Sequence, residues 1–315
     1  MESLWKEFLS EGFCFLFCVA LFTFIFINRK LFVKFISNFY HGDKIQHNSS
    51  ALCDSPGCVR CNKYEQAQIR AKKRLDMYLA IVQAEPEGPK TNQKHLDRIS
   101  ESVMGEGNVK YEVENQCPNV LYVKGLLAKP IWQDCMFQAD VKILESNADS
   151  IFKEFECVYA STVGWVCNTT PTGKWLVFHL VNQGTKLEDN CKKCPHTVSL
   201  LKALPSFMGC NLLGNASFSV VYPGTEIAEH FGPTNIRIRT HLGLVVPPEC
   251  ELHVGGQTAT WKQGQCTVFD DSFSHSVKHS VKGEGSRVVF MVDLWHPGLT
   301  LEEKIALDFI YSPDL

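Results

Sequence analysis

Neither sign of charge is in large excess in this sequence. Its 31 lysines and arginines stand against 34 aspartates and glutamates, which gives a formal net charge of -3. Proteins that gather phosphate groups usually carry a basic surface, so nucleic acid is not expected as a partner. An internal repeat is also absent. The 315 residues, 45% of them hydrophobic, are enough for one large domain with appendages or for two domains.

A cleavage site for a signal peptide is a second feature that the sequence lacks. The apolar run from Gly12 to Asn28 holds no charged side chain, but no small-residue cleavage site follows it. As a helix this run would reach roughly 26 Å, which just spans a bilayer. We therefore expect an N-terminal transmembrane helix, with residues 1–35 as the membrane anchor. A removed signal peptide and a buried core helix are the alternatives.

The orientation of this anchor is open, because two signals disagree. Arg29, Lys30 and Lys34 follow the apolar run, and the positive-inside rule would place the C-terminal side in the cytosol. Fourteen cysteines and three N-glycosylation sequons instead suit an oxidising compartment that glycosylates. The sequons begin at Asn48, Asn168 and Asn215. We favour a single-pass protein of the endoplasmic reticulum with a lumenal C-terminal domain.

Residues 36–110 are polar and uneven. A cysteine cluster at Cys53, Cys58 and Cys61 precedes a stretch in which apolar residues fall at helical spacing. These apolar residues are Leu75, Tyr78, Leu79 and Val82. The prolines of Glu85–Pro89 should end that helix, and Lys90–Asn108 is mostly polar. We interpret residues 36–110 as a stalk or linker before a domain of residues 111–315.

The C-terminal domain is predicted to be mainly β. One amphipathic helix is expected first, over Ala139–Tyr159, and short strands rich in β-branched residues follow. These strands are expected at Trp175–Leu180, Ala216–Tyr222, Arg237–Val246, Gln265–Phe269 and Arg287–Trp295. Glycine, proline, asparagine and aspartate cluster between them. Such a pattern predicts a double-stranded β-helix, or jelly roll, with flanking α-helices.

His230 and His275 are candidate iron ligands. Ferrous iron accepts imidazole nitrogen, and oxygenase sites usually add a carboxylate two residues after the first histidine, where this chain has Gly232. The two histidines would meet only if a sheet folded one over the other. His279 is a rival for His275, but in a strand the two would lie about 13 Å apart and could not share one ion. Asp270 and Asp271 are assigned to hydrogen bonding rather than to the metal.

Several stretches around these histidines match a known family in the same order. They are Tyr222–Thr225, His230–Asn235, Arg239–Leu244, Phe269–Phe273 and Val292–Pro297. Taken together, and from about Ile131 to the C-terminus, they resemble the aspartyl/asparaginyl β-hydroxylases, which are 2-oxoglutarate-dependent oxygenases. The resemblance implies His230 and His275 as the two Fe(II) ligands, and it implies that the missing carboxylate at Gly232 is a trait of the family.

The same resemblance implies a cosubstrate site. Arg287 would form the salt bridge to the distal carboxylate of 2-oxoglutarate, and its apolar surroundings favour an arginine that faces inward. Further cosubstrate contacts are implied for Trp175, Ser219, Arg239, Thr240 and His241. The reaction would use O2 to convert 2-oxoglutarate to succinate and carbon dioxide while a carbon of the substrate is hydroxylated. Aspartate or asparagine side chains of a protein or peptide are the implied substrates.

Other interpretations of the sequence stay open. The domain could be a membrane-tethered pseudoenzyme that acts as a binding module, or a structural protein in which the histidines hold zinc. Two C-x-x-C pairs, Cys58–Cys61 and Cys191–Cys194, could form a zinc site, disulfides or surface thiols. Halogenating relatives of ferrous oxygenases also lack the carboxylate ligand, so halide transfer is a further alternative.

Overall fold

All strands of the described residues lie in the C-terminal half of the chain. The computed structural model describes residues 59–84, 92–105, 111–133, 135–161 and 163–313, all of which fall in one compact unit, Cys53–Pro313. The strands are β1 Trp165–Asn168, β2 Trp175–Asn182, β3 Thr185–Lys186, β4 Ala216–Val221, β5 Glu226–His230, β6 Arg237–Val245, β7 Cys250–Val254, β8 Gln257–Ala259, β9 Cys266–Phe269, β10 His275–His279 and β11 Arg287–Trp295. Each strand predicted from the sequence is present, with its ends shifted by two residues or fewer.

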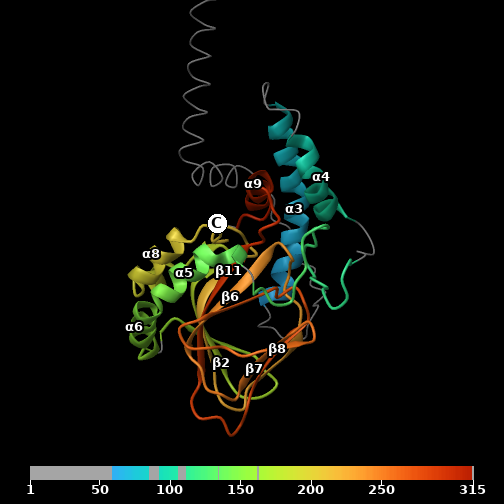
Figure 1. Ribbon diagram of the computed structural model, residues 1–315. Coiled ribbons are helices and arrows are strands. Elements are labelled where there is room, and N and C mark those ends of the chain that lie inside the picture. The colour runs from blue at the N-terminus through green and yellow to red at the C-terminus, as the bar shows by residue number, and fades with distance from the viewer. Residues whose placement is uncertain (1–58, 85–91, 106–110, 134, 162, 314–315) are drawn as a thin grey trace, which may run out of the picture. The chain divides into compact units, whose positions relative to one another are not determined.

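These strands pair antiparallel into two sheets. A seven-stranded sheet has the order β1-β2-β4-β11-β6-β9, with β3 paired to β2, and a four-stranded sheet has the order β5-β10-β7-β8. From β4 onward, consecutive strands alternate between the two sheets, except that β7 and β8 form a hairpin within the smaller one, and such alternation is typical of a jelly roll. The prediction of a mainly β jelly roll with flanking helices is confirmed (Figure 1).

Successive side chains of β11 point to opposite faces of the larger sheet, and both faces are buried there. Val288, Phe290 and Val292 face the helices and belong to one apolar core, whereas Val289 faces the smaller sheet and belongs to another. Every residue of β11 is buried. Fully burying one such side chain stabilises the folded state by roughly 1.5–3 kcal/mol. Since β11 contributes side chains to two apolar cores, it is a central element of the fold.

Helices cover the outer face of the larger sheet. They are η1 Cys135–Phe137, α5 Gln138–Ser146, α6 Ala148–Tyr159, α7 Glu188–Cys191 and α8 Pro195–Ala203. In Figure 1, α5, α6 and α8 gather beside β6 and β11. The single helix predicted over Ala139–Tyr159 is broken at Asn147, whose side-chain amide donates to the Ile143 carbonyl at 2.8 Å. Asparagine competes in this way with the helical backbone, although Leu144 and Ile151 still face the core as predicted.

The interpretation of residues 36–110 as a stalk is wrong for its described helices. The remaining helices, α3 Val59–Ala84, α4 Asn92–Met104 and α9 Leu301–Ile310, share one apolar core. Ile99 of α4 and Leu307 of α9 are fully buried in it. The polar composition of Lys90–Asn108 concealed one apolar stripe on α4. The helix predicted around Leu75 ends at Ala84, as expected from the prolines that follow.

The anchor prediction, residues 1–35, lies outside the described residues, and so do Asn48, Cys53 and Cys58. Across residues 59–313, apart from the short gaps, no helix is both long and apolar enough to span a membrane. The boundaries predicted for the three segments of the chain stay predictions.

Candidate active site

His230 and His275 lie side by side. His230 ends β5 and His275 begins β10, and the two residues are directly opposite each other in the antiparallel pair. Their ring centroids are 4.0 Å apart. The sheet was expected to fold one histidine over the other, and the two residues do lie on separate, paired strands of the same four-stranded sheet. Strand pairing therefore sets their separation directly.

Backbone carbonyls fix the tautomer of both rings. Nδ1 of His230 lies 2.8 Å from the Ala228 carbonyl, and Nδ1 of His275 lies 2.9 Å from the Phe273 carbonyl. A carbonyl oxygen only accepts, so each Nδ1 carries the hydrogen and each Nε2 keeps its lone pair. Burial and the neighbouring His230 lower the pKa of His275 to about 3, so this ring is neutral at pH 7. Such a carbonyl contact is the usual support of a metal-binding histidine.

Gly232 has no room for a side chain. Its N–H donates to the Asp271 carbonyl at 2.6 Å, and a Cβ built at this position would lie 2.6 Å from Cγ of Asp271. The missing carboxylate therefore has a physical cause, because Asp271 occupies the space that any residue other than glycine would need.

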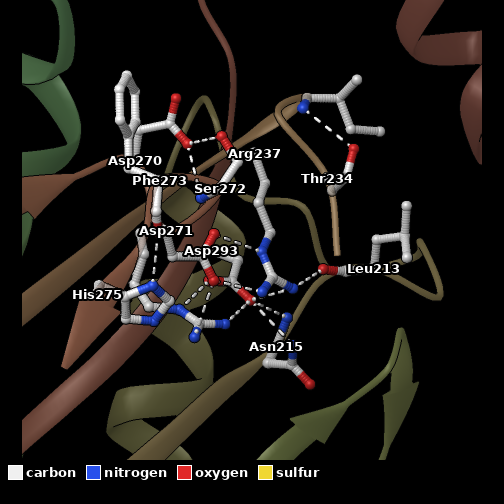
Figure 2. Close-up of polar contacts among 12 residues, drawn as sticks. Leu213, Asn215, Thr234, Arg237, Asp270, Asp271, Ser272, Phe273, His275 and Asp293 are labelled. Atoms are coloured by element: carbon white, nitrogen blue, oxygen red, sulfur yellow. Dashed lines mark hydrogen bonds and ion pairs between the residues drawn. The ribbon is translucent and has the colours of Figure 1, made fainter. Parts of the chain in front are cut away.

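Asp271 belongs to a buried network of two arginines and two aspartates (Figure 2). Nε of Arg237 donates to Oδ1 of Asp271 at 3.1 Å, while Nε of Arg239 donates to Oδ1 of Asp293 at 2.8 Å. Nη1 of Arg239 lies 3.1 Å from Oδ2 of Asp271 and so links the two pairs. Burial alone would raise the pKa of Asp271, but the charges of Arg237 and Arg239 hold that pKa well below its usual value. Asp271 therefore pairs with the two arginines, in agreement with its assignment to hydrogen bonding rather than to the metal.

The segment predicted to contact the cosubstrate, Arg239 to His241, divides between the two faces of β6. His241 pairs with Met291 and faces the smaller sheet, whereas Thr240 pairs with Val292 and faces the helices. The Thr240 hydroxyl therefore faces away from the space between the sheets, and its contact with the cosubstrate stays a prediction. Arg239 lies on the inner face, but its guanidinium already pairs with Asp293 and Asp271.

Arg287 is a buried cation without a carboxylate partner among the described residues. It is 1% exposed, and Nη1 donates to Oγ of Ser219 at 3.4 Å. Indole Nε1 of Trp175 donates to the same hydroxyl at 3.0 Å, so three residues predicted for the cosubstrate site lie together. Nε of Arg287 is buried and has no hydrogen-bond partner within the described part of the chain. Burial lowers its pKa, yet a guanidinium stays charged at neutral pH, and this charge calls for an anion.

His241 and Trp261 complete this inner surface. Indole Nε1 of Trp261 donates to Nδ1 of His241 at 3.2 Å, which leaves the hydrogen of His241 on Nε2. That Nε2 is buried and lacks a partner among the described residues, so it is a donor that points at no protein acceptor. Burial, followed by the charges of Arg287 and Arg239, holds the pKa of His241 well below its usual value. The guanidinium carbon of Arg287 lies 4.7 Å from the centroid of the Trp261 ring.

Three of these residues escaped prediction from the sequence. Arg237 shares the alternation of Arg239 and His241, so the strand pattern could have placed it on the inner face. Asp293 lies within the apolar stretch Val292–Leu294, where a buried acid needs a cation, and this was a second usable signal. Trp261 follows a short strand in a turn, and nothing in its local sequence indicates its contact with Arg287.

Other expected sites are not placed near the histidine pair. His279 is in a strand, as expected, and its Nε2 lies 2.9 Å from the Gly285 carbonyl. Cys191 and Cys194 are buried, and neither forms a disulfide with another described cysteine. Burial raises the pKa of Cys194 to about 12, which favours the thiol over the thiolate that zinc binds. A zinc site shared with Cys58 and Cys61 stays a prediction, because the side chains of these two lie outside the described part.

Comparison with known proteins now adds to this geometry. The family model for "Aspartyl/Asparaginyl beta-hydroxylase" matches residues 132–297, just over half of the chain. This chain belongs to that family. The predicted resemblance is confirmed by this match, which spans His230, His275 and Arg287.

Curated relatives extend this family match toward the N-terminus. Human aspartate beta-hydroxylase domain-containing protein 2 is 41% identical over 274 residues, which cover 84% of this chain and 72% of the relative. Human aspartyl/asparaginyl beta-hydroxylase is 38% identical over 195 residues, which cover 60% of this chain and 25% of the relative. A predicted oxalate decarboxylase from Thermotoga maritima covers 43% of this chain and 95% of its own at 14% identity, with a TM-score of 0.29, too low to bear on function.

Proposed function

We propose that this chain is an Fe(II)- and 2-oxoglutarate-dependent dioxygenase that hydroxylates aspartate or asparagine side chains of protein substrates. Family membership supports a hydroxylase. The observations that support the metal and the cosubstrate are two adjacent imidazoles, each with Nδ1 bonded to a backbone carbonyl, and one buried guanidinium with no carboxylate partner among the described residues.

The donor set fits ferrous iron. Nε2 of His230 and Nε2 of His275 would hold the ion, and imidazole suits divalent iron. Two neutral ligands leave the double charge of the ion unbalanced, so a dianionic cosubstrate that binds the metal directly would be favoured. Iron and 2-oxoglutarate, when bound, would let O2 act as the oxidant, with one oxygen atom entering a carbon–hydrogen bond of the substrate and the other entering succinate as 2-oxoglutarate loses carbon dioxide.

The inner surface also fits the cosubstrate. Arg287 would grip its distal carboxylate, since a planar guanidinium can bond both oxygens, and Ser219 stands beside it. The unpartnered Nε2–H of His241 is a further donor for an oxygen of the same ligand. His275 is 5% exposed and Arg287 is 1% exposed, so the protein would exclude water from these contacts.

The test compares the wild-type chain with Arg287→Ala and Arg287→Lys. Fe(II) and 2-oxoglutarate are added without oxygen, their binding is measured, and succinate is counted after air is admitted. A charge-assisted hydrogen bond contributes about 1.5–3 kcal/mol, so Arg287→Ala should weaken 2-oxoglutarate binding about 10- to 100-fold. Arg287→Lys keeps the charge but loses the planar guanidinium that bonds both carboxylate oxygens. Its 2-oxoglutarate affinity should therefore lie between those of the wild-type chain and Arg287→Ala.

The outcomes separate the rival functions. Succinate release by the wild-type chain supports the dioxygenase. Binding of both ligands without succinate would instead favour a pseudoenzyme that serves as a binding module, and unchanged affinity in Arg287→Ala would contradict the role of Arg287. Preference for zinc over iron, with no effect of 2-oxoglutarate, would favour the structural zinc protein.

We also propose that the chain is a single-pass membrane protein of the endoplasmic reticulum, with the domain of residues 111–315 in the lumen. The uncharged run Gly12–Asn28 supports the anchor. The sequon at Asn168 supports the lumenal orientation, because Thr169 within it is exposed at the edge of the larger sheet.

A further inference from the structure

A segment outside the family match, Asn115–Val123, crosses the turns that carry both histidines. We call it the strap. It precedes residues 132–297, to which the family model is matched, and it contains no residue of a named strand. Isolated β-bridges join Gln116 to Phe273 and Leu121 to Thr234. One short segment thus pairs with the turn before His275 and with the turn after His230.

The strap fixes the turn before His275 through its backbone. The Ser274 N–H donates to the Asn115 carbonyl at 2.8 Å, and the Cys117 N–H donates to the Ser272 carbonyl at 3.2 Å. Phe273, between these two residues, provides the carbonyl that orients the ring of His275. The backbone that sets the tautomer and angle of His275 is therefore held on both sides by the strap.

A buried side chain of the strap holds the same turn. Nε2 of Gln116 donates to Oδ2 of Asp270 and to Oγ of Ser272, both at 3.0 Å. Asp270 in turn accepts the Ser272 N–H at 2.9 Å, which closes the turn (Figure 2). Gln116 is 2% exposed and Asp270 is 1% exposed, so water cannot readily replace the lost amide.

The strap fixes the turn after His230 in a similar way. The N–H groups of Val120 and Leu121 both donate to the Pro233 carbonyl, at 2.9 Å and 3.0 Å. The side chain of Asn235 then bonds both backbone groups of Val123, accepting its N–H at 2.9 Å and donating to its carbonyl at 2.9 Å. Pro233 lies three residues after His230, so this contact limits how far the end of β5 can move.

We propose that the strap is the element that positions the two ligand histidines, with two positioning residues: Gln116 on the strap and Asn235, which binds the strap at Val123. The inference rests on the proposed function, since it assigns the strap to the same iron site. The strap is itself supported by the helical part of the chain, because Nε2 of Gln68 on α3 donates to the Val120 carbonyl at 3.1 Å.

The test measures anaerobic Fe(II) affinity and the 2-oxoglutarate affinity of the iron-loaded full-length chain in Gln116→Met and Asn235→Leu. Each change keeps the approximate volume and removes the amide. Because outer residues that orient metal ligands typically contribute 10- to 100-fold to affinity, Fe(II) binding should weaken by at least tenfold in each variant. The 2-oxoglutarate affinity should change less, since Arg287 lies on the other sheet.

Asn190→Leu is the matched control. It removes a buried amide that donates to the His179 carbonyl at 2.8 Å, far from the strap in the chain. It should lower the melting temperature without weakening Fe(II) binding. Gln116→Asn provides a milder change should Gln116→Met not fold, and it too should bind Fe(II) more weakly than the wild-type chain.

Two results would overturn the inference. If the wild-type chain binds Fe(II) and the strap variants bind it within twofold as tightly, the strap does not position the ligands, while the proposed function stands. If the wild-type chain binds no Fe(II), both the proposed function and the inference fail.

Discussion

At the residue scale, the chemistry of the site depends on which polar atoms already have a hydrogen-bond or ion-pair partner in the protein. The Nδ1 atoms of His230 and His275 are committed to carbonyls, and the guanidinium of Arg239 is committed to two aspartates. Nε of Arg287 and Nε2 of His241 have no hydrogen-bond partner among the described residues, and Arg287 has no carboxylate partner there. The histidine pair is therefore suited to bind a cation, and the surface around Arg287 is suited to bind an anion.

Substitution of Gly232 should not restore a carboxylate ligand. A Cβ at this position would lie 2.6 Å from Cγ of Asp271, and buried ion pairs hold Asp271 in place. We expect Gly232→Ala and Gly232→Asp both to bind Fe(II) at least tenfold more weakly than the wild-type chain, and overpacking to cost about 1–3 kcal/mol of stability. Anaerobic Fe(II) titration checks this, and tighter binding by Gly232→Asp would contradict it.

Asp270 should make stability depend on pH. Burial raises the pKa of Asp270 to about 7, whereas the unfolded chain has an ordinary value of about 3.9. Between these values the native state binds more protons than the unfolded state, so ionisation of Asp270 lowers the free energy of unfolding as pH rises. The stability of the wild-type chain relative to Asp270→Asn should fall from about pH 4 to pH 7 and then stay level. Denaturant melts across this range check it, and a difference that is constant or rises with pH would be the opposite result.

The residues of the site were predictable to different degrees. Resemblance placed His230, His275 and Arg287, and the geometry brings the two histidines together. The resemblance also implied Thr240, as part of the segment from Arg239 to His241, although the period of a strand assigns Thr240 to the other face. The partners Asp293 and Trp261 come from elements distant in the sequence, and local pattern carries little information on such contacts.

At the element scale, strand positions were predictable and strand neighbours were not. A short apolar run with three valines predicted β11 from Arg287 to Trp295, because the composition of such a run is a local property. The pairing of β5 with β10 joins residues about 45 positions apart, and only the topology of the whole sheet determines it. The same limit explains why α4 was taken for part of a linker, since its partner α9 lies near the C-terminus.

The packing of α4 on α9 can be tested by truncating Ile99. This side chain is fully buried, and replacing such an isoleucine with alanine typically costs 2–5 kcal/mol. We expect Ile99→Ala to lower the free energy of unfolding of the domain by that amount, in one cooperative transition. The control Ile81→Ala, at a position 38% exposed on α3, should stay within about 0.5 kcal/mol of the wild-type chain. An unchanged melt of Ile99→Ala would indicate a stalk that does not pack.

At the scale of the whole molecule, the two described sequons are not equivalent. The amide nitrogen of Asn215 donates to Oδ2 of Asp293 at 2.9 Å, and its oxygen accepts the Gln183 N–H at 3.0 Å. A glycan on Asn215 would break this contact with the aspartate that balances Arg239. Asn168 instead lies at the sheet edge in β1. Only Asn168 of these two is compatible with a glycan on the folded chain.

Glycosidase treatment of protein from cells tests both this difference and the proposed orientation. If the domain is lumenal, the mobility of the wild-type chain should shift on treatment. In Asn168→Gln that shift should be smaller by the contribution of one glycan. In Asn215→Gln the shift should equal that of the wild-type chain. Absence of any shift would support the cytosolic orientation, and loss of a glycan in Asn215→Gln would contradict the contacts of Asn215 with Asp293.

The measurement that tests the account most directly is anomalous X-ray scattering at the iron edge, from crystals grown without oxygen in the presence of Fe(II) and 2-oxoglutarate. We expect one iron ion bound to Nε2 of His230 and Nε2 of His275, with a carboxylate of 2-oxoglutarate against Arg287. Iron bound elsewhere, or an Arg287 that faces no anion, would contradict the assignment of this site.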